Sequence, residues 1–280
     1  TRQIDMAAAK EGIKQKVRGW SHHDSADLYG IDDWGNGYFR ISKKGEVTVR
    51  LNDEDGGKKD VSLCDLLEGL KERGTTVPVL FRFRDLLRSR IAELNDSFRK
   101  AIKEAGYQGK YQGVYPIKVN QQRQVVEEIA EFGTKYDYGL EAGSKPELIA
   151  AMAHMHNPNA YLICNGYKDD EFIDLALTAQ KMGLNIFIVL EMPSELDVIL
   201  ERARRMDIRP NLGVRVKLAA KGSGLWQESA GDKSVFGLNA AQVVDVVDKL
   251  KQVDALDCLQ LLPYPQGSQT PTISVVREGL

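Results

Sequence analysis

From about residue 80 onward, short apolar runs alternate with amphipathic stretches in which apolar residues recur every three to four positions. The first such stretch, "FRDLLRSRIAELNDSFRKAI", predicts a helix with one apolar stripe formed by Leu87, Ile91, Leu94, Phe98 and Ile102. The β-branched and aromatic run "GVYPIKV" then predicts a strand, and "QQRQVVEEIAEFG" predicts a second helix. Because glycine tolerates the left-handed conformation that often ends a helix, we expect Gly133 to be the C-cap.

Further apolar runs follow at intervals of roughly 22 to 26 residues until a Gly-rich insertion, which is the spacing of strand–helix units. We predict strands in "YDYGLEAG", "AYLICN", "NIFIVLE", "NLGVRVKLA" and "LDCLQLL". Ser144 and Glu147 have the spacing of a capping box, as do Asn239 and Gln242, so a helix should begin at each pair. The helix predicted in "PSELDVILERARRM" has an apolar stripe formed by Leu196, Ile199, Leu200, Ala203 and Met206.

Consecutive strand–helix units with right-handed crossovers form either an open doubly wound sheet or a (β/α)8 barrel. The glycine pattern of dinucleotide-binding folds does not follow the first strand, and "KGSG" at 221–224 is too short to replace it. The sequence therefore predicts an α/β fold with an incomplete (β/α)8 TIM-type barrel, about six βα units where a full barrel has eight.

Residues 29–65 have a different pattern, with short strand-like runs separated by the glycine-containing turns "NG", "KKGE" and "DEDGG". This pattern predicts a small β-rich module ahead of the barrel. With the boundary near Pro78, we assign residues 1–78 to the N-terminal β-rich module and residues 79–280 to a partial barrel.

The composition is that of an ordinary globular protein, 42% hydrophobic and 28% charged with a net charge of −2. This charge offers neither a basic surface for nucleic acid nor a polybasic patch for a membrane. No apolar run approaches the roughly 18 residues of a membrane helix, and the first residues lack the apolar region of a secretory signal.

Cysteine and histidine spacing argues against disulfides and metal sites. The three cysteines are odd in number and far apart, as expected for free thiols in a reducing cytoplasm. The four histidines form the pairs His22–His23 and His154–His156, and neither pair has the i, i+4 spacing that places two metal ligands on one helix face.

Polar and charged residues follow the predicted strands, where the loops of a βα barrel converge on one opening. They are Lys118, Glu141, Asn165, Glu191, Arg215, Lys217 and Ser268. A lysine, two acids and further basic groups around one opening suit a charged ligand that resembles an amino acid.

Each of these residues has a structural and a functional interpretation. Lys118 either extends to water from a strand end or is a nucleophile, since burial among apolar groups would lower its pKa and free its amine for Schiff-base formation. Glu141 either positions Lys118 or forms a plain ion pair, and Arg215 either meets an anionic cofactor group or is one of two alternating strand charges. Gly267 and Ser268 offer an amide and a hydroxyl to a phosphate.

Several long motifs resemble, in order, those of the biosynthetic arginine decarboxylases, which are pyridoxal-phosphate enzymes with an alanine-racemase-like barrel. The motifs are "WGNGYF", "VYPIKVNQ", "GLEAGSKPEL", "CNGYKDDEFI", "LGVRVKLAAKGSGLWQESAGDKSVFGL" and the final "GSQ". The resemblance extends from about Trp20 to Gln269.

The resemblance implies decarboxylation of L-arginine to agmatine and CO2, a step of polyamine biosynthesis, with pyridoxal 5'-phosphate as cofactor. It implies that Lys118 carries the cofactor, that Glu141 and Arg215 lie beside it and that Ser268 contacts its phosphate. It also implies a dimer-based homo-oligomer for the full-length enzyme. Magnesium is a further cofactor implied by the resemblance, although the sequence shows no site for it.

The last part of the chain departs from the family pattern, with "PYPQGSQ" where relatives have "HFHLGSQ", so that Pro265 replaces a histidine that stacks on the cofactor. Family members are also about twice as long. We therefore expect the 280-residue chain to be a truncated form that is inactive alone. The alternatives are a non-catalytic homologue that regulates a decarboxylase subunit and a related racemase or diaminopimelate decarboxylase.

Overall fold

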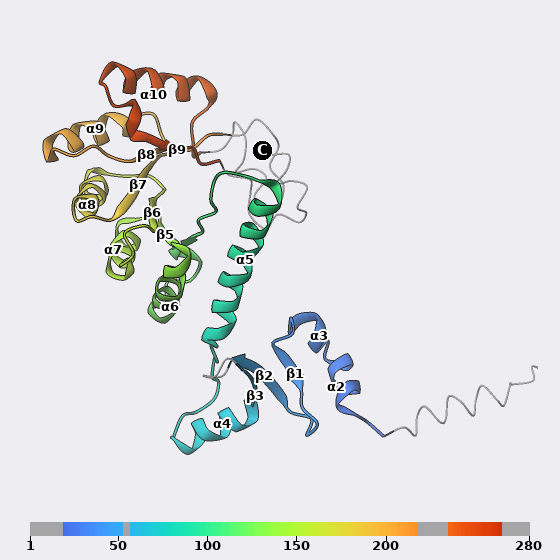
Figure 1. Ribbon diagram of the computed structural model, residues 1–280. Helices are drawn as coiled ribbons and strands as arrows, with labels where there is room; N and C mark the ends of the chain where they lie inside the picture. The colour runs from blue at the N-terminus through green and yellow to red at the C-terminus, as the bar shows by residue number, and fades with distance from the viewer. Residues whose placement is uncertain (1–18, 53–56, 218–234, 265–280) are drawn as a thin grey trace, which may run out of the picture. The chain divides into compact units, whose positions relative to one another are not determined.

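The computed structural model describes residues 19–52, 57–217 and 235–264, which divide into two compact units after Ser89 (Figure 1). This division falls inside helix α5 (Arg84–Ala105), whereas residues 73–83 form neither helix nor strand. Because domain boundaries usually fall in exposed linkers, we keep the boundary near Pro78 as our proposal.

The first unit contains a three-stranded antiparallel sheet with strand β2 in its centre. Its elements are α2 (His22–Leu28), α3 (Ile31–Trp34), β1 (Phe39–Ile41), β2 (Val47–Asn52), β3 (Lys58–Ser62) and α4 (Leu63–Glu72). Val49 on β2 is fully buried, and Gly45 has the positive φ of 82° that the turn between β1 and β2 requires. The sheet confirms the predicted β-rich module.

The segment "YGIDDW" within this module is helical instead of extended, which corrects the strand pattern predicted from residue 29 onward. It forms α3, and Gly30 precedes the helix with a left-handed φ of 56°. Asp32 and Asp33 lie in the first helical turn, where their charges interact favourably with the helix dipole.

The second unit contains six parallel strands whose order in the sheet is the same as their order in the chain. The strands are β4 (Val114–Pro116), β5 (Gly139–Ala142), β6 (Tyr161–Cys164), β7 (Asn185–Leu190), β8 (Leu212–Val214) and β9 (Leu259–Leu261). The helices that follow them are α6 (Arg123–Gly133), α7 (Lys145–His154), α8 (Asp170–Lys181), α9 (Glu195–Met206) and α10 (Ala240–Gln252). The described residues of this unit also form the short 3-10 turns η1 (Ile117–Val119), η2 (Thr134–Tyr136) and η4 (Leu256–Cys258).

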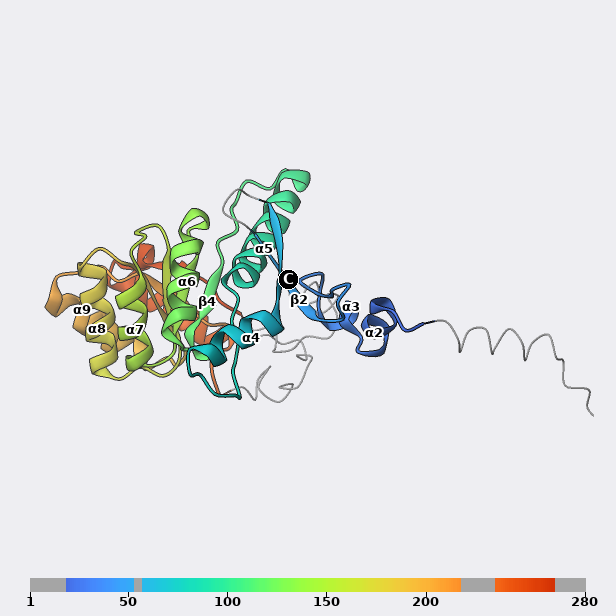
Figure 2. The ribbon, with the colours of Figure 1, turned by 90° about the horizontal axis from the view of Figure 1, so that it is seen from below.

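The strand order confirms the barrel prediction. A doubly wound sheet reverses its strand order at a switch point, and the six described strands show no such reversal. Helices α6 to α10 form an arc outside the strands, and α6 to α9 stand side by side in chain order (Figures 1 and 2). The described residues therefore contain five successive βα units of a TIM-type barrel and its sixth strand.

The core of this unit has two layers, one on each face of β7. Residues 186–190 are all buried, as expected for a parallel strand covered on both sides. Phe187 and Val189 pack with Ile163 of β6 in a cluster on one face, and the buried stripe of α9 covers the outside of the barrel. The predicted stripe positions Leu196, Ile199 and Ala203 are each at most 2% exposed, which confirms the helix prediction.

The predicted stripe of α5 is only partly buried. Ile91 is buried, but Leu94 and Phe98 are 40% and 45% exposed. Asn95 is buried instead and donates a hydrogen bond from Nδ2 to the carbonyl of Ile91 at 2.8 Å. Phe98 stacks on Tyr111, with ring centroids 3.9 Å apart, so its contact is aromatic and local to the surface.

α6 ends at Gly133 and α7 begins after Ser144, as predicted, but the capping roles predicted for these two residues are wrong. Gly133 has a right-handed φ of −67° inside α6 and its continuation η2, and the left-handed residue is Asp137 at φ 53°. A Cβ at Gly133 would lie 2.7 Å from Cβ of Tyr138, so the glycine permits close packing and does not end the helix. Ser144 forms no side-chain cap, because Glu147 accepts a hydrogen bond from the amide of Gly143, at 2.7 Å.

The capping box at the start of α10 is confirmed, with Asn239 and Gln242 each accepting a hydrogen bond from the other's backbone amide. The fifth and sixth strands are shorter than predicted. After β8 a single parallel bridge joins Val216 to Leu238, and the amide of Val216 donates to the carbonyl of Pro263 at 2.8 Å. These contacts continue the barrel wall beyond the short strands.

Candidate functional site at the carboxyl ends of the strands

Lys118 lies at the carboxyl end of β4, in the 3-10 turn η1. Its side chain is 65% exposed, and its Nζ is 3.8 Å from Oε1 of Glu141. Of the two placements considered for Lys118, the structure shows extension to water from a strand end, because β4 ends at Pro116 and the following turn buries Ile117. The exposed amine is instead accessible to a ligand from solution.

Glu141 holds a carboxylate in the buried wall beside Lys118. It pairs in register with Pro116 across β4 and β5, and its side chain is only 9% exposed. Its Oε1 atom forms the 3.8 Å ion pair with Lys118 but, among the described residues, accepts no hydrogen bond. Since a buried carboxylate oxygen without a hydrogen bond costs free energy, Glu141 is poised to accept one from a ligand.

A second buried acid, Glu191, follows β7 and holds Arg215 at the end of β8. Nη1 of Arg215 is 3.2 Å from Oε1 of Glu191, and the amide of Gly166 donates to the same oxygen at 3.0 Å. The other oxygen, Oε2, is buried and lacks a hydrogen-bond partner. The guanidinium carbon of Arg215 also lies 5.6 Å from the ring centroid of Phe236, so the Arg215 side chain is fixed between an acid and an aromatic ring.

A buried ion pair that the sequence analysis did not identify lies behind these residues. The side chains of Lys168 and Glu195 are 0% and 3% exposed, and Nζ of Lys168 is 3.3 Å from Oε1 of Glu195. Burial lowers the pKa of Lys168, while the charges of Glu195 and Glu191 act in the opposite direction. In the sequence, Lys168 precedes two aspartates and looks like part of a solvated charge run. The sequence therefore gives no indication that Lys168 is buried.

Glu195 connects this ion pair to the backbone at the site. Its Oε1 accepts the amide of Lys168 at 3.1 Å, and its Oε2 accepts the amide of Glu191 at 2.7 Å and that of Met192 at 3.3 Å. One carboxylate therefore ties the loop after β6 to the loop after β7. This arrangement fixes the position of Glu191 and, through it, that of Arg215.

Glycine is required at position 166 of the same loop. Gly166 has a φ of 77°, and a Cβ there would lie 2.7 Å from the carbonyl oxygen of Gly143. The close approach lets the Gly166 amide reach Glu191. Cys164, at the end of β6, is fully buried, and burial raises the pKa of its thiol to about 12, so it stays protonated and is no nucleophile at neutral pH.

Of the remaining predicted site residues, Asn165 and Lys217 form backbone hydrogen bonds at the strand ends, and Ser268 is not described. Asn165 donates its amide to the carbonyl of Ala142 at 3.0 Å, and Lys217 donates its amide to that of Leu238 at 2.8 Å. Ser268 and Pro265 lie outside the described residues. The strand ends thus bring together Lys118 with Glu141 and Arg215 with Glu191.

The part of the chain that the structure describes lacks both a metal-binding cluster and a membrane-spanning helix. It contains no group of three or more histidine, cysteine, aspartate or glutamate side chains arranged to hold a metal ion. No helix within it has the length and apolar character needed to span a membrane.

Comparisons with known proteins agree with this architecture. Residues 89–263 match the family model for the pyridoxal binding domain of pyridoxal-dependent decarboxylases. A biosynthetic arginine decarboxylase of Gloeobacter violaceus is 48% identical over 264 residues, which are 94% of this chain and 41% of that protein. Arginine decarboxylase 1 of Oryza sativa subsp. japonica is 46% identical, over 98% of this chain and 40% of that protein.

Solved structures give the same result for the fold. The crystal structure of the biosynthetic arginine decarboxylase of Campylobacter jejuni matches with a TM-score of 0.78 and 35% identity, over 90% of this chain and 40% of that one. The diaminopimelate decarboxylase of M. jannaschii matches with a TM-score of 0.57 and 20% identity, over 86% of this chain and 50% of that one, which supports the fold alone.

The chain spans about two fifths of the length of the arginine decarboxylases that it matches. The matched family model covers the six parallel strands described above and includes both Lys118 and Arg215. By this match and by its barrel, the chain belongs to the pyridoxal-dependent decarboxylases, of which it contains the pyridoxal binding domain.

Proposed function

We propose that this chain is the cofactor-binding part of an enzyme that decarboxylates L-arginine to agmatine and CO2. The observation that carries the proposal is the exposed amine of Lys118 beside the unpartnered, buried carboxylate of Glu141. Relatives that are 43–48% identical over most of the chain are named arginine decarboxylases, which supports the choice of substrate. Because the chain spans about two fifths of those relatives, the proposal concerns the complete gene product that carries this sequence.

The described residues fit pyridoxal 5'-phosphate as the cofactor. The accessible Lys118 amine would form the covalent link, and the unpartnered oxygens of Glu141 and Glu191 would accept hydrogen bonds from polar hydrogens on the ligands. Arg215 would meet an anionic group, and Ser268 is proposed as a phosphate contact on the family resemblance. When bound, the cofactor supplies a ring that takes up the electrons released as CO2 leaves.

The chain's own residues prepare Lys118 for this role. An amine forms a covalent link with a carbonyl group only when it has lost its proton. Oε1 of Glu141 lies 3.8 Å from Nζ of Lys118, so the carboxylate holds the amine at the mouth of the barrel, where either group could move a proton to or from a bound substrate. Glu191 restrains Arg215, so that an anion meets a cation of fixed orientation.

Assembly, location and metal use are further parts of the proposal. We infer a dimer-based homo-oligomer from the family resemblance. A reducing cytoplasm suits the three cysteines, which are all free, two of them buried. Magnesium dependence stays a prediction from the resemblance, and we assign it no residue.

The substrate should be identifiable by steady-state kinetics of the complete gene product with pyridoxal 5'-phosphate. We expect kcat/KM for CO2 release from L-arginine to exceed that for ornithine, lysine or diaminopimelate by at least about a hundredfold, since a site that hydrogen-bonds one polar group strongly rejects analogues lacking it. Agmatine should accumulate in equal amount to CO2. The 280-residue chain, assayed in parallel, should form none.

Other outcomes would identify one of the alternatives. Preference for diaminopimelate, lysine or ornithine would indicate a related decarboxylase. A gene product that binds neither the cofactor nor arginine would be a non-catalytic relative, and the proposed function would be wrong.

A further inference from the structure

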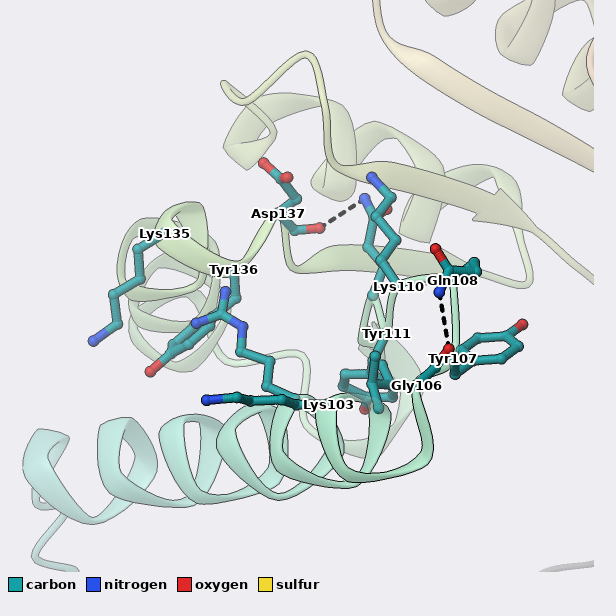
Figure 3. A pocket seen from close by; sticks show the side chains of 13 residues that line it. Lys103, Gly106, Tyr107, Gln108, Lys110, Tyr111, Lys135, Tyr136 and Asp137 are labelled. Carbon is teal, nitrogen blue, oxygen red and sulfur yellow. Dashed lines mark hydrogen bonds between the residues drawn. The ribbon is translucent and has the colours of Figure 1, made fainter.

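A pocket with a volume of about 340 Å³ lies between the C-terminal part of α5 and the segments that precede β4 and β5 (Figure 3). Arg99, Lys103, Lys110 and Lys135 contribute four cations to its lining, whereas Asp137 is the one carboxylate among the residues that line it. The pocket therefore carries a formal charge of about +3.

This pocket is separate from the candidate site for decarboxylation. Gln112 and Asp137 precede strands β4 and β5, whereas Lys118 and Glu141 lie at the carboxyl ends of the same strands. In parallel strands these two ends are at opposite edges of the sheet. The function of the pocket is therefore independent of the proposed decarboxylation.

The three lysines of the pocket lack acidic partners. Within the described residues, no carboxylate lies within the 4.0 Å ion-pair distance of Lys103, Lys110 or Lys135. Several other cations of this unit are paired, as Arg123 is with Glu127 at 2.6 Å and Arg202 with Asp174 at 2.7 Å. Lys103 lies in the last turn of α5, where a cation also suits the helix dipole, but Lys110 and Lys135 lie outside that helix.

Asp137, the carboxylate of the pocket, already accepts a hydrogen bond from another residue. Oδ1 of Asp137 accepts a hydrogen bond from Nδ2 of Asn157 at 2.9 Å. In Figure 3 its carboxylate extends away from Lys103. Arg99 has a distant acidic partner, with Nη1 4.0 Å from Oδ1 of Asp96, so the weakly compensated charges of the pocket are those of its three lysines.

Aromatic rings lie beside three of the cations. The ring centroid of the buried Tyr136 is 4.7 Å from the guanidinium carbon of Arg99 and 4.8 Å from Nζ of Lys135, which is also 4.1 Å from the ring centroid of Phe132. Nζ of Lys110 is 6.0 Å from the ring centroid of Tyr161, and Tyr111 stacks on Phe98. Because Tyr136 and Tyr111 already use a ring face in these contacts, they are poorly placed to stack on a planar ligand.

We propose that this pocket binds a small phosphate-bearing ligand with at least two negative charges. Four cations around one cavity repel each other, and an anion between them relieves that repulsion. A cleft with charge of one sign also concentrates counter-ions of the other sign. Lysine binds phosphate as a point charge, and a phosphate group carries a charge of about −1.5 to −2 against −1 for a carboxylate, so three lysines around one pocket favour phosphate.

Isothermal titration calorimetry with inorganic pyrophosphate tests this proposal on the complete gene product loaded with pyridoxal 5'-phosphate, which keeps the probe from the cofactor site. We expect a Kd below about 1 mM. The Lys103→Gln/Lys135→Gln variant should weaken binding at least about tenfold, equivalent to the loss of charge-assisted contacts. The single variant Lys110→Gln should weaken it in the same direction.

The control is Lys181→Gln/Arg204→Gln, which removes the same charge from exposed positions of the same unit. It should leave the Kd within about twofold, because charges beyond the Debye length are screened. Absence of binding to the parent protein would overturn the proposal. Equal weakening in both double variants would also overturn it, since it would show dependence on net charge alone.

Discussion

Replacing Lys118 with alanine in the complete gene product should lower arginine decarboxylation by at least about a thousandfold, which is about 4 kcal/mol of transition-state stabilisation. The amine of Lys118 would be lost, and the buried carboxylate of Glu141 would lose its ion partner. Single-turnover assays with saturating pyridoxal 5'-phosphate measure this loss.

Two further variants separate chemistry from charge. Lys118→Arg should not restore activity, because a guanidinium stays protonated and cannot form the covalent link. Lys100→Ala, at an exposed position paired with Glu104 on α5, should keep nearly full activity. Normal turnover by Lys118→Ala would show that the lysine is not the cofactor's attachment point.

Replacing Glu195 with glutamine should destabilise the fold by about 3–5 kcal/mol, because it leaves the buried ammonium of Lys168 without its counter-charge. The double variant Lys168→Met/Glu195→Gln should recover part of this loss, since it also removes the unpaired charge. Urea unfolding followed by circular dichroism measures both values. Equal destabilisation in the single and double variants would argue against a coupled pair.

Asp197 provides the matched control for Glu195. Both acids lie in the first turn of α9, but Asp197 pairs with Lys249 at the surface. Asp197→Asn should change the free energy of unfolding by less than about 1 kcal/mol, because exposed ion pairs contribute little.

The pH dependence of stability should identify Lys168 as the buried group. Burial lowers its pKa from the ordinary value of 10.5, so the unfolded state binds the proton more tightly than the folded state does. The free energy of unfolding, relative to Lys168→Met, should therefore increase as the pH rises from the lowered pKa toward 10.5. This increase in the free energy of unfolding is lost again as the pH falls from 10.5 to the lowered, folded-state pKa of Lys168.

The sequence predicts the barrel well because its strands and helices follow local periodicity. The buried stripe of α9 and the capping box at Asn239 both depend on neighbours within a few residues. Gly133 and Ser144 were interpreted wrongly, because each is determined by a contact outside the local pattern, with Tyr138 and through Glu147 with Gly143.

Contacts between residues far apart in the sequence limit the prediction of the candidate site even more than that of the fold. The strand-end positions of Lys118, Glu141 and Arg215 were predictable, since they follow apolar runs. The sequence left open whether Lys118 is exposed, because its exposure depends on β4 ending at Pro116. The pair of Lys168 and Glu195 joins a loop residue to the first residue of α9, 27 positions further on, and no local pattern links them.

Lys168 is a second candidate for the lysine that forms the covalent link with the cofactor. Lys168 has the burial and the lowered pKa that favour a nucleophilic amine, but its side chain is fully enclosed and ion-paired with Glu195. Lys118 is the accessible amine at the mouth of the barrel. Accessibility decides between them, since a ligand has to reach the amine.

Borohydride reduction of the complete gene product with bound pyridoxal 5'-phosphate, followed by peptide mapping, tests this assignment most directly. Reduction makes the link between lysine and cofactor permanent, so that the modified peptide identifies the residue. We predict the label on the peptide that contains "YPIK", at Lys118. Label at Lys168, or at any lysine other than Lys118, would contradict the account.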